Sequence, residues 1–367
     1  MANPVYDRIV EIGERLYAQL ERGEPIALES VSRHVSNLVF DEATRAYRLG
    51  EKKTVRSVSK VKELRTILQF VAVLNFIRQC MEQNELVSLR ELYYTFKNRE
   101  INGVSVSFDD QSQSNMIVEE IECLLGCTRE DMNVLAEPSG AQAFGNLVVY
   151  DGSSRSTIDF SSNTNIQVPQ LPHMVKVKRA DFDIVLAVET SGLYSRIARA
   201  LKLGKAQRLA ELRPLLVSTK GVPSRAVRQF IGKLHSELGK PVFLFTDFDQ
   251  GGLNIALYMQ SGSAKSAHLP LAIPDIRWIN SARDIVEYDL PAERMGEAKI
   301  KAFRRLLNDP RVKGTRYEKE INDFVEMGLE AEGEALARQG IYYIVTDYLP
   351  EKIAKLSDRN AYKPSSA

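Results

Sequence analysis

The chain has 367 residues, which is more than a single hydrophobic core usually serves, so its length predicts two domains. Its 49 basic and 48 acidic residues leave a formal net charge of +1, so a nucleic-acid partner would have to be bound by local basic patches and not by overall charge. Three cysteines, no secretory leader and no long apolar stretch are typical of a soluble cytoplasmic protein and argue against a membrane association.

The first half of the chain is predicted to be mostly helical. Apolar residues at helical spacing indicate an amphipathic helix at 5–20, a helix apolar on all sides at 61–80, and shorter helices at 88–98 and 112–125. The glycine-punctuated segment 136–151 is predicted to be a β-hairpin. Helices followed by a hairpin are typical of a winged-helix (CAP-like) domain, whose last helix normally faces a DNA groove.

The second half alternates between strand and helix patterns. Residues 153–172 are rich in Ser, Thr, Asn and Gln, so we predict a first domain at 1–152, a linker at 153–175 and a second domain at 176–367. The alternating segments are strands at Ile184–Val188, 215–218, Val242–Phe245 and 276–279, and helices at 193–203, 224–238 and 253–259. This alternation predicts an α/β fold with a parallel sheet flanked by helices, followed by a helical C-terminal extension.

Carboxylates follow two of the predicted strands. Glu189 directly follows Ile184–Val188, and Asp247 and Asp249 come just after Val242–Phe245. If these strands are neighbours in a parallel sheet, the three carboxylates meet at its carboxyl edge, where open α/β sheets bind their ligands. A cluster of carboxylates without His or Cys favours a hard divalent cation, and Mg²⁺ fits best.

A helical projection separates two adjacent tyrosines in the predicted helix 88–98. Tyr93 falls on the apolar face, whereas Tyr94 lies on the face that carries Arg90 and Lys97, one turn away on either side. Cationic neighbours lower the cost of ionising a phenol, and a guanidinium can hold a phosphate through its planar fork. The alternative is that Tyr94 is an ordinary surface aromatic and Arg90 a solvated side chain.

Two arginines lie at the start of the predicted helix 224–238. Arg225 and Arg228 follow the segment 221–224, and the exposed backbone amides at a helix start favour phosphate. Together with Lys97 they are our candidate contacts to DNA phosphates, which would carry no sequence information.

In combination these residues resemble the A subunit of topoisomerase VI, a family that also includes the proteins that make meiotic double-strand breaks. The resemblance covers nearly the whole chain and depends on the order and joint presence of several short segments. They are Arg90-Glu91-Leu92-Tyr93-Tyr94, Val188-Glu189, Gly221-Val222-Pro223-Ser224-Arg225, Thr246-Asp247-Phe248-Asp249, Gly252-Leu253-Asn254-Ile255, Glu287-Tyr288-Asp289-Leu290-Pro291 and Tyr348-Leu349-Pro350-Glu351-Lys352.

The resemblance implies roles for the residues that match. The second domain is expected to be a Toprim domain in which Glu189, Asp247 and Asp249 bind Mg²⁺. Tyr94 is expected to be the nucleophile, with Arg90 contacting the phosphate, and the product would be a double-strand break with 5′-phosphotyrosine links.

The resemblance also implies partners. Expected are double-stranded DNA, a homodimer of A subunits, and a GHKL-type ATPase B subunit that supplies the ATP dependence in an A2B2 heterotetramer.

Two positions depart from the family pattern: Gln250 replaces the proline common in Asp-x-Asp-Pro-x-Gly, and Thr190 replaces the lysine that commonly follows the strand-end glutamate. Neither change removes a carboxylate.

Two other interpretations remain open. A Toprim metal enzyme could hydrolyse nucleic acid, with Tyr94 serving only to bind it, and would leave no protein attached to DNA. A winged-helix DNA-binding protein with structural carboxylates is disfavoured because carboxylates without local cations are costly to bury.

Overall fold

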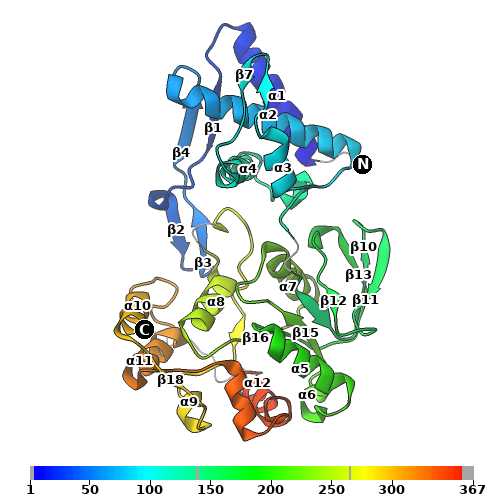
Figure 1. Cartoon of the computed structure of the whole chain (residues 1–367), viewed down its shortest axis with the longest axis vertical. Helices are drawn as coiled ribbons and strands as arrows, with labels where there is room; N and C mark the ends of the chain where they lie inside the picture. The colour runs from blue at the N-terminus through cyan, green and yellow to red at the C-terminus, as the bar shows by residue number, and fades with distance from the viewer. Residues whose placement is uncertain (1–3, 138–139, 264–265, 358–367) are drawn as a thin grey trace. The chain divides into compact units, whose positions relative to one another are not determined.

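The computed structural model describes residues 4–137, 140–263 and 266–357, and it divides into two compact units (Figure 1). The first unit takes residues 4–39, 48–137 and 266–270 of the described chain, and the second takes 40–47, 140–263 and 271–357. Among the described helices, none combines the length and the apolar character needed to span a membrane.

The first unit is built on helices, and their predicted positions are confirmed to within a few residues. Their apolar faces form one core, in which Ile77, Leu92, Val118 and Ile121 are fully buried. The elements are α1 (Pro4–Glu21), β1 (Ala27–Val31), β4 (Lys53–Ser57), α2 (Val61–Gln83), β5 (Val87–Ser88), α3 (Leu89–Phe96), β6 (Glu100–Ile101), β7 (Val104–Ser105), α4 (Gln111–Leu125) and β8 (Val134–Leu135). Strands β1 and β4 pair antiparallel, β5 and β8 pair parallel, and β6 and β7 form a hairpin between α3 and α4. A further pair, β2 (Leu38–Asp41) and β3 (Ala46–Leu49), forms its own two-stranded sheet.

The hairpin predicted at 136–151 is wrong. Its two strands, β9 (Gln142–Phe144) and β10 (Leu147–Asp151), enter different sheets of the second unit. Between them the backbone of Gly145 has a φ of +149°, and a Cβ there would lie 2.9 Å from the carbonyl oxygen of Pro214. The two strands therefore separate at Gly145, a position where only glycine fits. Because the predicted hairpin was part of the winged-helix assignment, that assignment of the first unit stays a prediction.

The second unit is centred on a six-stranded sheet in the order β12-β9-β15-β14-β16-β17. Strands β15 (Pro214–Ser218), β14 (Ile184–Val188), β16 (Val242–Phe245) and β17 (Arg277–Trp278) run parallel, and the first three of these are buried along their whole length. The predicted parallel α/β sheet is confirmed, with α5 (Ser191–Lys202), α6 (Gln207–Glu211), α7 (Arg225–Leu238) and α8 (Gln250–Ser261) connecting its strands. Antiparallel β9 and β12 (Ile166–Gln167) extend one side.

The predicted linker at 153–175 is also wrong, because these residues belong to the second unit. They contain β11 (Ser156–Asp159), β12 and the 3-10 helix η3 (Pro172–Met174), and β11 joins β10 and β13 (Val175–Ala180) in a three-stranded sheet. The polar residues that suggested a linker form turns held by side chains. For example, Asp159 Oδ1 accepts hydrogen bonds from the backbone N–H and the hydroxyl of Ser161. Phe160 is fully buried against Phe230, which anchors the segment.

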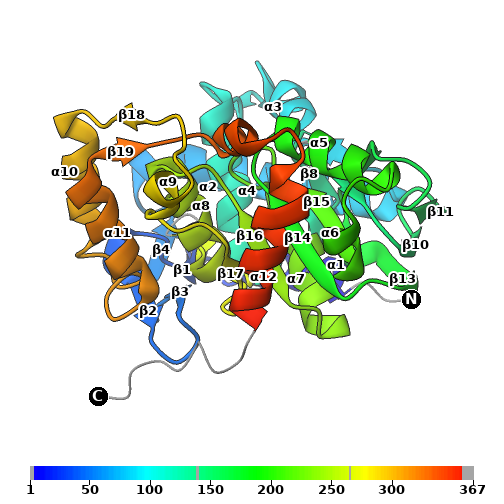
Figure 2. The same ribbon diagram turned by 90° about the horizontal axis from the view of Figure 1, so that it is seen from below.

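The C-terminal part is largely helical, as predicted. Helices α10 (Glu297–Leu306) and α11 (Arg316–Met327) lie side by side in Figure 2, joined by the stacked rings of Phe303 and Phe324, whose centroids are 5.0 Å apart. The remaining elements are α9 (Asp284–Glu287), β18 (Glu293–Arg294), β19 (Leu329–Glu330), the 3-10 helix η5 (Gly333–Gln339), the π-helix η6 (Ile344–Tyr348) and α12 (Leu349–Ser357).

Candidate active site

The start of α3 is fixed by a capping box. Ser88 Oγ accepts a hydrogen bond from the backbone N–H of Glu91 at 3.0 Å, and Glu91 Oε2 accepts one from the backbone N–H of Ser88 at 2.7 Å. The bond from the Ser88 backbone N–H lowers the pKa of the Glu91 carboxyl group. The cap sets the rotation of the short helix, and therefore determines which side chains face the core and which face outwards.

The helical projection of the two tyrosines is confirmed. Leu92 and Phe96 are buried and Tyr93 packs partly buried against the same core, whereas Tyr94 is 52% exposed. The guanidinium carbon of Arg90 lies 5.9 Å from the centroid of the Tyr94 ring, and Lys97 Nζ lies 5.4 Å from it. Both cations therefore flank the ring that the helix displays.

The surface around Tyr94 can accept a phosphate. An open hollow of about 710 Å³ is lined by Ser88, Arg90, Glu91, Tyr94 and Thr95. Arg90 has one ion pair among the described residues, with Glu137 at 3.9 Å, and both side chains are mostly exposed. Such a pair contributes little to stability, so Arg90 can exchange it for a phosphate at small cost.

The carboxylates of the second unit lie where parallel strands place them. Val188 and Phe245 are partners in the β14–β16 register, so the residues that follow them leave the sheet at the same edge. The Glu189 backbone N–H donates to the Phe245 carbonyl at 3.0 Å, and the Asp247 backbone N–H donates to Glu189 Oε2 at 3.0 Å.

Backbone amides hold one oxygen of each carboxylate. In addition to the bond to Glu189, the Gly333 N–H donates to Asp247 Oδ1 at 2.8 Å and the Gly252 N–H donates to Asp249 Oδ1 at 2.7 Å. The other oxygen of each carboxylate has no hydrogen-bond donor in the described ranges. Each group is thus oriented by the backbone and retains one oxygen for a ligand.

The electrostatics of this cluster favour a cation. Burial raises the pKa of Glu189 to about 7 against the lowering effect of the Asp247 amide, and the charges of Asp247, Asp249 and Glu334 add to the rise. Burial likewise raises the pKa of Asp247 to about 6, against the lowering effect of the Gly333 amide and with the carboxylates of Glu334 and Asp249 adding to the rise. A bound cation would remove this penalty on the ionised forms.

A fourth carboxylate, which was not predicted from the sequence, lies beside these three. Glu334 accepts a hydrogen bond from the Thr190 hydroxyl at 2.8 Å and raises the pKa of both Glu189 and Asp247. Its segment reaches the cluster because Phe248 and Ala331 exchange backbone hydrogen bonds in an isolated β-bridge. The sequence signal is Glu332-Gly333-Glu334, an acidic pair around a glycine, in a region whose pattern otherwise predicts helix.

The donor chemistry fits Mg²⁺, although the side chains do not converge on one point as they stand. In the described ranges no group of three or more His, Cys, Asp or Glu side chains is arranged to hold a metal ion. However, every candidate donor is an oxygen, three carboxylates keep an oxygen without a partner, and two carry raised pKa values.

We expect the metal-free protein to lose stability as the pH rises. The folded-state pKa values of Glu189 and Asp247 lie above their ordinary values of 4.5 and 3.8, so the folded state binds more protons than the unfolded state between about pH 4 and pH 7. The melting temperature should fall across this interval, and Mg²⁺ should restore part of it at neutral pH. Calorimetry on Glu189→Gln should show a smaller fall, while the exposed control Glu237→Gln should follow the parent. A melting temperature that rises over this interval in the parent would contradict the expectation.

The predicted DNA contact at Arg228 is wrong. Arg228 is fully buried, with its guanidinium carbon 4.0 Å from the Tyr258 ring centroid and its Nη2 donating to the Leu271 carbonyl at 2.9 Å. Helix α7 buries the face that carries Val227, Arg228 and Ile231, so Arg228 serves the core. Arg225, the first residue of α7, is partly buried and follows the capping Ser224.

Comparison with known proteins agrees with this geometry. The family described as the Toprim domain of the topoisomerase 6 A subunit and Spo11 matches residues 184–353, which contain the parallel strands and the three carboxylates. The family described as "Type IIB DNA topoisomerase" matches residues 65–134, which include α3.

Relatives match the chain over nearly its whole length. The A subunit of type 2 DNA topoisomerase 6 from Methanothermobacter thermautotrophicus is 32% identical over 96% of this chain and 98% of the relative. The protein of the same name from Methanocaldococcus jannaschii is 33% identical over 94% of this chain and 93% of the relative. That from Natronomonas pharaonis is 32% identical over 95% of this chain and 95% of the relative. The chain belongs to the family of type IIB topoisomerase A subunits.

Proposed function

We propose that this chain is the DNA-cleaving and rejoining subunit of an ATP-dependent type IIB topoisomerase. The observation that carries the proposal is the exposed Tyr94 between Arg90 and Lys97, in a chain whose other unit carries a cluster of oriented carboxylates. The family membership supports it and does not favour the nuclease interpretation.

The reaction is a transesterification at a DNA phosphodiester. The Tyr94 hydroxyl gives up its proton to water as its oxygen attacks phosphorus, the new O–P bond forms as the bond to the 3′ oxygen breaks, and that oxygen takes a proton from water and leaves as a 3′ hydroxyl. Arg90 neutralises charge that develops on the phosphoryl oxygens, and Lys97 holds a neighbouring phosphate. Because the phosphotyrosine bond retains the energy of the phosphodiester, the same steps in reverse reseal the strand.

Glu189, Asp247 and Asp249 would hold Mg²⁺, with Glu334 as a further oxygen donor. When bound, the ion supplies positive charge next to the reacting phosphate. The backbone amides of Asp247, Gly252 and Gly333 would orient the carboxylates that hold the ion.

The partners follow from the same proposal. The chain acts on double-stranded DNA as a homodimer, in which two tyrosines cut opposite strands, and Arg225 contacts DNA phosphates. ATP is used by a separate GHKL-type B subunit in an A2B2 assembly, which is the stoichiometry we propose for the complex.

Covalent trapping tests the proposal. The chain is incubated with a candidate B subunit, ATP, Mg²⁺ and supercoiled plasmid, the reaction is stopped with denaturant, and DNA ends are examined for attached protein. We expect protein on the 5′ ends and free 3′ hydroxyls. Cleaved DNA without attached protein would overturn the proposal in favour of a metal-dependent nuclease.

A further inference from the structure

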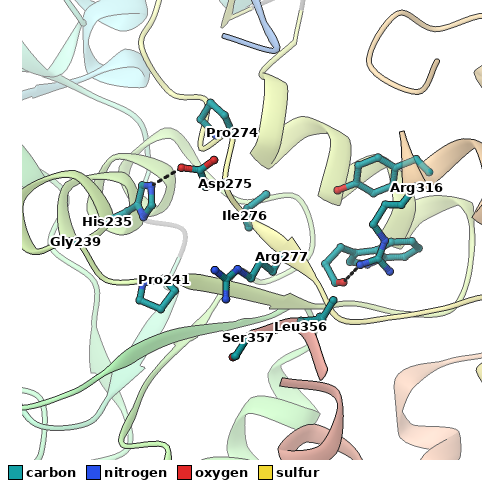
Figure 3. Close-up of a pocket in the computed structure, with 12 residues that line it drawn as sticks. His235, Gly239, Pro241, Pro274, Asp275, Ile276, Arg277, Arg316, Leu356 and Ser357 are labelled. Atoms are coloured by element: carbon teal, nitrogen blue, oxygen red, sulfur yellow. Dashed lines mark hydrogen bonds and ion pairs between the residues drawn. The ribbon is translucent and has the colours of Figure 1, made fainter. Parts of the chain in front are cut away.

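The second unit has a pocket at the end of its sheet opposite to the carboxylates. The pocket has a volume of about 630 Å³ and lies where β16 and β17 begin, next to the C-terminal end of α7 (Figure 3). This volume is within the range of sites that bind small molecules. Glu189, Asp247 and Asp249 follow the carboxyl ends of β14 and β16, so the pocket is separate from the candidate active site.

Apolar and polar side chains share the lining of the pocket. Pro241, Pro274, Ile276 and Leu356 line its sides. Trp278 lines it from β17 and is itself buried, with its ring 5.7 Å from that of Tyr317, which also lines the pocket. The apolar side chains of this lining suit a ligand with an apolar part.

One cation in this pocket has no anionic partner. Arg277 extends from β17 towards Pro241 in Figure 3, and its guanidinium carbon lies 5.3 Å from the Phe243 ring centroid. Within the described ranges its guanidinium makes no hydrogen bond or ion pair. Its planar fork of N–H donors is therefore available to a carboxylate or phosphate.

The other polar groups of the pocket are already engaged. Arg316 donates from Nη1 to the Trp278 carbonyl at 2.8 Å and from Nη2 to the Asn280 carbonyl at 2.9 Å, so it holds the end of β17 in place. His235 Nδ1 lies 2.9 Å from the Lys240 carbonyl, and its Nε2 faces the mostly exposed Asp275 at 3.9 Å. Because the Asp275 carboxylate lines the same pocket, a ligand with several negative charges would be repelled.

We propose that this pocket binds a small organic anion with one acidic group. The carboxylate or phosphate of the ligand is held by the fork of Arg277, and its apolar part packs against Pro241, Pro274 and Leu356. The site does not depend on the proposed cleavage reaction, since none of its residues belongs to the candidate active site.

The single tryptophan of the chain gives a direct readout, because Trp278 lines the pocket. The full chain is titrated with benzoate and with phenyl phosphate while tryptophan fluorescence is recorded, and neutral benzamide is the matched control ligand. We expect a saturable change with at least one of the two anions and none with benzamide. The tighter anion tells whether the natural ligand carries a carboxylate or a phosphate.

Variants test the role of Arg277. Arg277→Gln should weaken anion binding at least tenfold, Arg277→Lys should weaken it less, and the exposed control Arg179→Gln should bind as the parent does. Circular dichroism checks that each variant is folded, and inorganic phosphate alone should compete only weakly because it lacks the apolar body. No saturable change with either anion in the folded parent, or equal affinity in folded Arg277→Gln and Arg277→Lys and the parent, would overturn the proposal.

Discussion

Tyr94→Phe is expected to abolish covalent attachment of the protein to DNA, by at least about a thousandfold. The substitution removes only the hydroxyl that attacks the phosphorus. The ring is half exposed, so the phenylalanine should keep its place between Arg90 and Lys97 without a change in folding. Denaturing gels of labelled plasmid, incubated with the B subunit, ATP and Mg²⁺, measure the fraction of 5′ ends that carry protein.

Tyr93→Phe is the matched control. Tyr93 is the adjacent residue with the same chemistry, but it packs partly buried against the core of the first unit, with its ring 5.2 Å from that of Tyr94. We expect attachment close to that of the parent. Attachment that survives in Tyr94→Phe and disappears in Tyr93→Phe would move the nucleophile to Tyr93, against the geometry of α3.

The parts of the site that sequence could predict depend on local periodicity. Which tyrosine faces outwards follows from the rotation of one short helix, and the Ser88 cap that fixes this rotation is only three residues from Glu91. The meeting of Glu189 with Asp247 needed one assumption, that β14 and β16 are neighbours. Their parallel pairing made that assumption correct.

The parts that sequence could not predict depend on distant contacts. Gly333 bonds Asp247 from 86 residues further along the chain, and no local pattern identifies that partner. The failed hairpin at 136–151 has a similar cause: β9 and β10 carry an ordinary hairpin signal, but each finds a better partner in a different sheet. Arginine side chains are usually exposed, so the sequence predicted a surface position for Arg228. Its burial follows from the packing of α7 against the core.

The turn between β16 and α8 is held by three hydrogen bonds at Thr246. The backbone N–H of Thr246 donates to Asn280 Oδ1, the Asn280 Nδ2 donates to the Thr246 carbonyl, and Trp278 Nε1 donates to Thr246 Oγ1, at 3.0, 2.7 and 2.9 Å. Thr246, Asn280 and Trp278 are all buried. The segment that carries Asp247 therefore cannot move without breaking several hydrogen bonds away from water.

Gly252→Ala is expected to lower the free energy of unfolding by about 3 kcal/mol and to reduce DNA cleavage in the protein that remains folded. A Cβ at this position would lie 2.3 Å from the carbonyl oxygen of Asp247 and 2.5 Å from Thr246 Oγ1, so the start of α8 must shift and withdraw the amide that orients Asp249. Denaturant unfolding measures the loss, and the matched control is Gly232→Ala within α7, where the nearest atom to a new Cβ is 3.9 Å away. The control should be as stable as the parent or slightly more so, because alanine favours a helix interior. A Gly252→Ala protein with the stability and cleavage activity of the parent would contradict the view that close packing of this turn positions the carboxylates.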